Sequence, residues 1–154
     1  MGTITGSAST EIRASIEAAY AVAADAEGAP RWQPEIEVAE CLERDERGNQ
    51  LRVRVETETP VKRLSSSLLC TYRSPTLVTW TQEDGDLKSV EGSWELEARE
   101  PDLTLVTYRL EVDPGRLLGM ALRGPVLDLL RGRLVETMPD KLKAFVEGGG
   151  AQAA

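Results

Sequence analysis

Apolar and polar residues alternate through the middle of this chain, and the alternation constrains the fold more than any other feature. Between residues 36 and 113, the segments around Leu51, Val90 and Val106 place an apolar residue at every second position. Strands with one covered face and one solvated face show this period of two. Turn-forming pairs such as Asp84-Gly85 separate the segments. The pattern predicts six consecutive antiparallel strands joined by short turns.

Residues before this block predict one more strand and two short helices. The strand is expected over Ile4 to Ile12 and the first helix after Ser15, whose hydroxyl suits an N-cap. A second short helix is expected over Asp25 to Trp32, and Pro34 ends it. The predicted sheet therefore has seven strands, with both short helices between its first and second strands.

After the strands, apolar residues spaced by three and four predict a long amphipathic helix over residues 125–147. Pro139 should kink it, because proline removes one internal hydrogen bond. At 1.5 Å per residue the helix is about 34 Å long, enough to cross the sheet. The predicted fold is α+β, a curved antiparallel sheet wrapped around this helix. Residues 1–147 are expected to form one domain, and the Gly- and Ala-rich residues 148–154 a disordered tail.

Composition and charge exclude several classes of function. The chain has no histidine, which removes His-based catalysis and His-ligated metal sites. The net charge of −8 argues against nucleic acid and against anionic membranes. The two cysteines, Cys41 and Cys70, are expected to be free and buried, although one disulfide stays an alternative. With no signal-peptide pattern and no long apolar run, a cytoplasmic location without membrane insertion is expected.

A straight helix leaves space under a strongly curved sheet unless large side chains fill it. Several positions that the alternation turns inward hold small residues: Thr57, Ser66, Cys70, Gly92 and Thr104. They favour a pocket between sheet and helix. A filled core with modest voids stays the alternative.

Four local patterns, in this order along the chain, resemble a known superfamily. They are Asp25 followed by Pro30-x-Trp32-x-Pro34, Trp80-x4-Gly85, Gly92-x-Trp94-x-Leu96, and Val112-x-Pro114-Gly115. Together with the element order they resemble the steroidogenic-acute-regulatory-protein-related lipid-transfer superfamily. Its helix-grip fold also occurs in birch-pollen-type allergens, aromatic polyketide cyclases and coenzyme-Q-binding proteins. The bacterial polyketide cyclase/dehydrase branch is the most similar.

The resemblance implies a deep cavity between sheet and long helix that binds an apolar or aromatic small molecule. Trp94 and Tyr108 match aromatic residues that line this cavity in the cyclases. Those cyclases also place an arginine in the pocket. In this chain the matching strand, Lys62 to Tyr72, offers no inward arginine, and Lys62 and Arg63 are expected near a rim.

Aromatic and apolar residues are the candidates for contact with a ligand. The candidate cavity residues are Trp32, Tyr72, Trp80, Trp94, Tyr108, Leu110, Leu127, Leu130, Leu134 and Met138. Each could instead be ordinary core, and Trp32 could be an entrance residue or an anchor for its helix. The apolar stretch Leu117 to Leu122 is either a gate over the mouth or a packed turn.

Three functions follow from these observations. The first is a binding protein for a lipid, an isoprenoid or quinone, or a polyketide. The second is a polyketide cyclase or aromatase, which would need a charged or tyrosyl group in the pocket. The third is a ligand-free protein-interaction module. No catalytic residue is assigned, and no metal or cofactor is expected. The oligomeric state stays open, with a homodimer among the alternatives.

Overall fold

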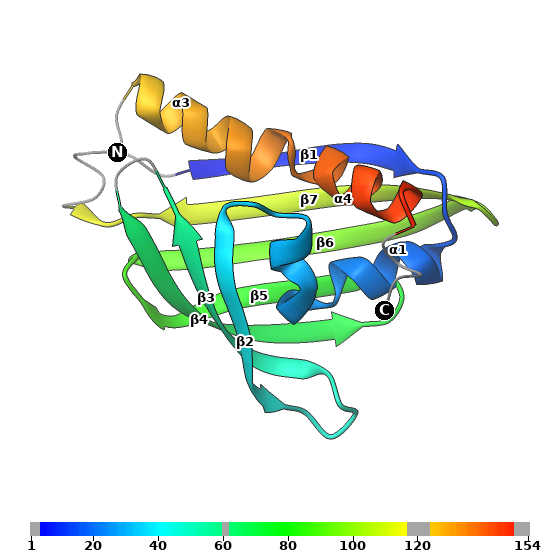
Figure 1. Cartoon of the computed structure of the whole chain (residues 1–154), viewed down its shortest axis with the longest axis horizontal. Coiled ribbons are helices and arrows are strands. Elements are labelled where there is room, and N and C mark those ends of the chain that lie inside the picture. The colour runs from blue at the N-terminus through cyan, green and yellow to red at the C-terminus, as the bar shows by residue number, and fades with distance from the viewer. Residues whose placement is uncertain (1–3, 60–61, 117–123, 150–154) are drawn as a thin grey trace.

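The structure is a computed structural model that describes residues 4–59, 62–116 and 124–149. The predicted gate at 117–122 and residues 150–154 of the predicted tail lie outside the described residues. One seven-stranded antiparallel sheet forms the body of the protein, in the order β1-β7-β6-β5-β4-β3-β2 (Figure 1). The strands are β1 (Ile4–Ile12), β2 (Ile36–Arg44), β3 (Gln50–Glu58), β4 (Arg63–Arg73), β5 (Leu77–Gly85), β6 (Ser89–Glu100) and β7 (Leu103–Asp113).

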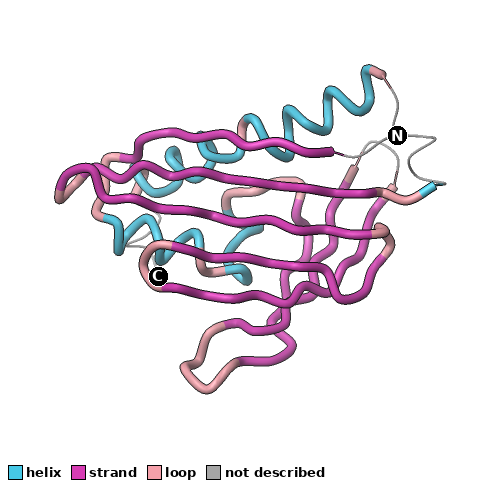
Figure 2. The backbone as a smooth tube through the Cα atoms, turned by 180° about the vertical axis from the view of Figure 1, so that it is seen from behind, coloured by secondary structure: helices cyan, strands magenta, loops and turns pink. Residues whose placement is uncertain are grey.

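The helices lie on one side of the sheet, as the two opposite views show (Figures 1 and 2). They are α1 (Ile16–Ala23), η1 (Ala26–Arg31), α3 (Pro125–Arg131), η2 (Gly132–Glu136) and α4 (Met138–Glu147). The Ser15 side chain caps α1 by accepting a hydrogen bond from the Ala18 amide. The η1 segment is a 3-10 helix with Pro30 as its fifth residue.

The sheet is curved, and its bulges explain where it bends. Strands β2 and β3 run at a steep angle to β6, β7 and β1 in Figure 1. The pairing register shifts at three places between β2 and β3 and at one place between β4 and β5, where Glu83 of β5 is the extra residue. A bulge bends its strand and increases the local twist. The bends turn this end of the sheet across the helices and leave a hollow on the inner face.

The C-terminal helix crosses the sheet as predicted, but it is not one kinked α-helix. A π-helical segment, η2, separates α3 from α4, and the Thr137 amide donates to the Gly132 carbonyl five residues earlier. Pro139 is the second residue of α4, where a missing N–H is tolerated. Pro139 therefore does not kink a continuous helix, because it lies at the start of α4, just after η2.

The core lies between the C-terminal helices, α1 and strands β1, β6 and β7. Its completely buried side chains include Ile12, Val106 and Leu142. The period-two alternation holds along β7, where residues 104, 106, 108, 110 and 112 are all buried. The core is filled at this end of the sheet, so the hollow lies toward the bent strands.

Candidate functional site

An internal cavity of about 200 Å³ lies between the bent sheet and the helices. Its walls come from strands β3 to β7 and from η1, with Leu130, Leu134 and Met138 on the helical side. Most of the lining side chains are apolar. The predicted pocket is therefore present.

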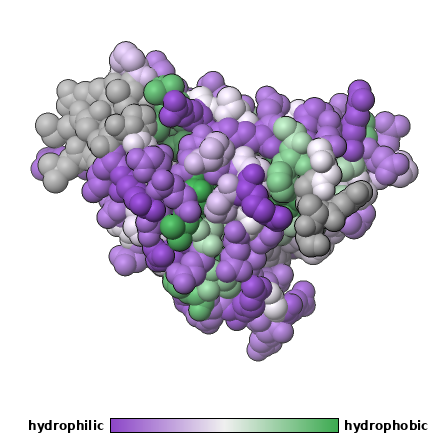
Figure 3. All heavy atoms as spheres, in the orientation of Figure 1, coloured by the Kyte–Doolittle hydropathy of each residue, from purple (hydrophilic) through white to green (hydrophobic). Residues whose placement is uncertain are grey.

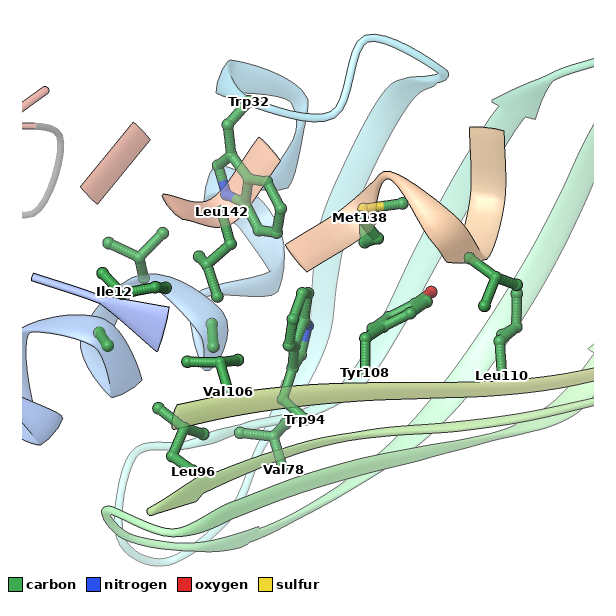
Figure 4. Close-up of a cluster of buried hydrophobic side chains, with 14 of the residues drawn as sticks. Ile12, Trp32, Val78, Trp94, Leu96, Val106, Tyr108, Leu110, Met138 and Leu142 are labelled. Atoms are coloured by element: carbon green, nitrogen blue, oxygen red, sulfur yellow. The ribbon is translucent and has the colours of Figure 1, made fainter. Parts of the chain in front are cut away.

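Four aromatic rings form a continuous group on the cavity wall. The centroids of Trp94 and Tyr108 are 4.6 Å apart, and those of Trp80 and Tyr108 are 5.7 Å apart. Trp32 continues the group, with its centroid 6.0 Å from that of Trp94. Figure 4 shows Trp94 and Tyr108 rising from the sheet toward the helix that carries Met138. Tilted pairs at these separations are favourable ring contacts.

Trp32 has the anchoring role that the sequence offered as one alternative, and it also lines the cavity. Its side chain is buried, it packs against Trp94, and it lines the cavity. It thus anchors the end of η1 to the sheet and also forms part of the cavity wall.

The hydroxyl groups of the two cavity tyrosines differ in their partners. The Tyr72 hydroxyl donates to the Gln50 carbonyl at 2.6 Å, so its proton is already hydrogen-bonded to the protein backbone. The Tyr108 side chain is mostly buried, and its hydroxyl has no hydrogen-bond partner among the described residues. Burial, followed by the negative charge of Glu35, raises the pKa of Tyr108 above its usual value. Tyr108 is therefore a neutral hydrogen-bond donor in the cavity.

Glu35 is a cavity residue that the sequence analysis missed. It lies between η1 and β2, and its side chain is 14% exposed. One carboxylate oxygen accepts from Lys141 Nζ of α4 at 2.7 Å. The other, Oε2, is buried and has no hydrogen-bond partner among the described residues. Loop residues show no periodic alternation of apolar and polar side chains, so the sequence does not indicate that this acidic side chain is buried. Its position between Pro34 and Ile36 is the one available signal.

The segment that carries Glu35 is tied to α4 twice. Besides the Glu35–Lys141 ion pair, the guanidinium carbon of Arg31 lies 5.4 Å from the ring centroid of Phe145. A cation at this distance from a ring is attracted to its face. The two contacts fix the η1–β2 segment against the helix beside the cavity.

The predicted cavity residues lie on the lining with one exception. Those on the lining are Trp32, Tyr72, Trp80, Trp94, Tyr108, Leu110, Leu130, Leu134 and Met138. Leu127 packs against the core, one or two helical turns before Leu130 and Leu134, and is not a lining residue. The apolar face of the helix thus serves the core at one end and the cavity at the other.

Two of the small inward residues add no free volume. The space beside Gly92 is occupied by the Trp80 indole. Thr104 is completely buried, and its hydroxyl donates to the Ala14 carbonyl at 2.9 Å. Thr57, Ser66 and Cys70 do line the cavity. Small side chains therefore mark the hollow only where β3 and β4 face it.

The Cys70 thiol is poorly suited to nucleophilic chemistry. Cys41 and Cys70 are both free, and Cys41 is only partly buried. Burial raises the pKa of the Cys70 thiol to about 11, so the thiolate that would act as a nucleophile is scarce at neutral pH. Among the described residues, no cluster of three or more Cys, Asp or Glu could hold a metal ion.

The two cationic residues expected at a rim, Lys62 and Arg63, do not line the cavity. Arg63 pairs with Glu37 at 3.0 Å and with Glu56 at 2.8 Å on the exposed side of the sheet. Lys62 is exposed, and neither residue lines the cavity. The outward face instead carries a network of arginine–glutamate pairs, as the alternation predicts.

The family model for polyketide cyclase/dehydrase and lipid transport matches residues 12–138. The chain belongs to this family. The match spans η1, strands β2 to β7 and the C-terminal helices up to Met138, and so includes every described lining residue except Ile4. By sequence, no curated protein matches the chain.

Solved structures show the same fold. A START superfamily protein from Mycobacterium smegmatis is 24% identical, with a TM-score of 0.81 over 94% of this chain and 97% of that one. A protein from Thermus thermophilus is 22% identical, with a TM-score of 0.76 over 97% and 99%. The Zhui aromatase/cyclase from a Streptomyces species is 16% identical, with a TM-score of 0.64 over 95% and 83%. The helix-grip fold of this family member is thereby confirmed.

No helix among the described residues has the length and apolar character that crossing a membrane requires. The face in Figure 3 is mostly hydrophilic, with small groups of hydrophobic side chains among the polar ones. Two large apolar side chains of the described residues are exposed, Leu42 on β2 and Leu129 on α3. They lie on different elements.

Proposed function

We propose that this family member binds a compact hydrophobic small molecule in the cavity between its sheet and its C-terminal helix. The observation that carries the proposal is the cavity of about 200 Å³ with its aromatic wall. An apolar cavity of about 150 Å³ already accepts benzene. Burial of ligand surface at about 25 cal/mol per Å² supplies the affinity, and a few polar groups set the orientation.

Thermal unfolding in the presence of one- and two-ring apolar compounds tests the proposal. A ligand at a hundred times its Kd stabilises the folded state by about 2.7 kcal/mol, which raises Tm by about 5 to 10 °C in a domain of this size. Leu134→Trp fills the cavity from the helix and should abolish the shift. Leu129→Trp adds the same side chain on the exposed side of α3 and should leave the shift unchanged. The proposal fails if no compound shifts Tm.

A second function, cyclisation of a β-ketone chain, is supported by Glu35 and Tyr108. A carboxylate can take a proton from a methylene between two carbonyls, and a tyrosine hydroxyl can donate to the enolate oxygen that forms. Glu35 lines the same cavity as the unpartnered Tyr108 hydroxyl. Deuterium exchange at the methylene of an aryl 1,3-diketone tests this. An enzyme should accelerate the exchange and lose the acceleration in Glu35→Gln, whereas a binding protein should leave the buffer rate unchanged.

A further inference from the structure

The charged groups on the cavity lining are acidic. Asp25 and Glu35 belong to the lining, and no lysine or arginine does among the described residues. The Asp25 carboxylate is already occupied, because it accepts from the Gly28 amide at 3.2 Å and from Gln50 Nε2 at 2.9 Å. Glu35 differs, since its Oε2 is buried and no described residue donates to it. One acceptor on the cavity wall is therefore left without a donor.

A buried acceptor without a donor is costly, because the protein has removed it from water without replacing the lost hydrogen bond. A hydroxyl group on a bound molecule can provide the missing donor. Glu35 also lies close enough to Tyr108 for its charge to contribute to the raised pKa of that tyrosine. The two side chains together offer an acceptor and a donor within the apolar cavity. An alcohol or phenol matches this pair, since its oxygen both donates and accepts.

A charged ligand matches the site less well. A carboxylate ligand would be buried beside Glu35 with no cationic side chain on the described lining to pair with it. An ammonium ligand would meet a carboxylate that Lys141 already neutralises at 2.7 Å, and the two cations would repel each other. An uncharged ligand avoids both costs.

The shape of the lining indicates the size and shape of the apolar part of the ligand. Trp80, Trp94 and Tyr108 present ring faces or edges within one connected group. Flat rings pack well against such a group. A volume of about 200 Å³ is below the range of about 300 to 1,000 Å³ for pockets that hold drug-sized molecules. One or two rings therefore fit better than a long acyl chain.

We propose that Glu35 selects ligands by charge, so that the cavity binds compact uncharged aromatic molecules with a hydroxyl group and rejects acids of the same shape. This inference rests on the proposed binding function and adds the ligand class to it.

Four molecules of one shape test the inference: naphthalene, 2-naphthol, 2-naphthoate and the ammonium form of 2-naphthylmethylamine. Their Kd values are measured with the full chain at pH 7 by calorimetry. We expect 2-naphthol to bind at least tenfold more tightly than naphthalene. We expect 2-naphthoate and the ammonium compound to bind at least tenfold more weakly than naphthalene.

Two substitutions test whether Glu35 causes this preference among the four ligands. Glu35→Gln removes the negative charge and leaves Lys141 without its partner, so 2-naphthoate should gain tenfold or more in affinity and 2-naphthol should lose several-fold. Glu37→Gln is the matched control, because Glu37 is exposed and pairs with Arg63 outside the cavity. It should leave all four Kd values unchanged. The wild-type comparison stands by itself if Glu35→Gln does not fold.

The results separate the two proposals. Equal binding of naphthalene and 2-naphthol, or tight binding of 2-naphthoate or the ammonium compound, overturns charge selection and leaves hydrophobic binding in place. Unchanged preferences in Glu35→Gln also overturn the role of Glu35. If none of the four molecules binds, both proposals fail together.

Discussion

The indole of Trp80 lies directly against the backbone of Gly92, its cross-strand partner on β6. A methyl group built at position 92 would lie 2.4 Å from atoms of that indole, far inside normal contact distance. Glycine at this position therefore gives the indole the space to lie along the sheet. The contact between Trp80 and Gly92 shapes one wall of the cavity, because Trp80 is a lining residue and also contacts Tyr108.

Substituting Gly92 with alanine should displace Trp80 and destabilise the fold by about 1–3 kcal/mol, the usual cost of overpacking. Chemical denaturation measures the loss, and tryptophan emission reports the changed surroundings of the indole. Gly132→Ala is the control, since the nearest atom to its added methyl would be 4.0 Å away and alanine favours helix. Unchanged stability and emission in Gly92→Ala would show that Trp80 does not lie against residue 92.

Removing the two tyrosine hydroxyls should have unequal effects on stability. Tyr72→Phe loses the hydrogen bond to the Gln50 carbonyl and should cost about 1 kcal/mol. Tyr108→Phe removes a hydroxyl without a partner among the described residues, so its unfolding free energy should stay within about 0.5 kcal/mol of wild type. Urea denaturation compares the two variants. A larger loss in Tyr108→Phe than in Tyr72→Phe contradicts this assignment.

Breaking the Glu35–Lys141 pair should cost more than breaking an exposed pair on the same helix. Lys141→Met leaves the Glu35 carboxylate largely buried without its cation, which should cost about 1–3 kcal/mol. Lys143→Met removes the more exposed Lys143–Glu147 pair and should cost less than about 1 kcal/mol. The free energies of unfolding of the two variants give the comparison. Equal losses would mean that the Glu35–Lys141 pair stabilises the folded protein no more than a surface ion pair does.

Stability should fall at alkaline pH because of Cys70. Burial raises the pKa of its thiol to about 11 in the folded protein, whereas the pKa of an unfolded cysteine is about 8.5. Above that pH the unfolded chain releases a proton that the folded protein keeps, so this contribution is complete below about pH 8.5 and is lost as the pH approaches 11. The shift corresponds to about 3 kcal/mol at most.

Urea unfolding from pH 8 to pH 11 measures this effect. Cys70→Ala should reduce the fall, and Cys41→Ala, at a partly buried position, should keep it. Both variants should retain a further loss near the top of this range, because burial also raises the pKa values of Tyr72 and Tyr108. A fall of the same size in Cys70→Ala and wild type would rule out the thiol as its source.

Most of the fold could be predicted from the sequence because periodicity reports which faces are buried. The alternation along β7, for example, places Val106, Tyr108 and Leu110 on the inner face, where all three are buried. The π-helical segment before Pro139 could not be predicted in the same way. A helical pattern shows which face is apolar, and it does not show how each backbone amide finds its acceptor.

The site was less predictable, since it depends on contacts between distant segments. The aromatic residues of the wall follow from strand alternation, but Glu35 lies in a loop and its partner Lys141 is on α4. Leu127 shares the helical spacing of Leu130 and Leu134, and only the position of the helix over the sheet separates its core role from theirs. Gly92 and Thr104 were expected to leave space, and Trp80 and the Ala14 carbonyl occupy their surroundings.

A crystal structure with 6-bromo-2-naphthol tests the binding account most directly, because anomalous scattering locates the bromine atom without reference to the protein coordinates. The account predicts one anomalous peak inside the cavity, between Tyr108 and the helix that carries Met138. The absence of a peak there, with Trp32, Trp80 or neighbouring side chains filling the space, would contradict it.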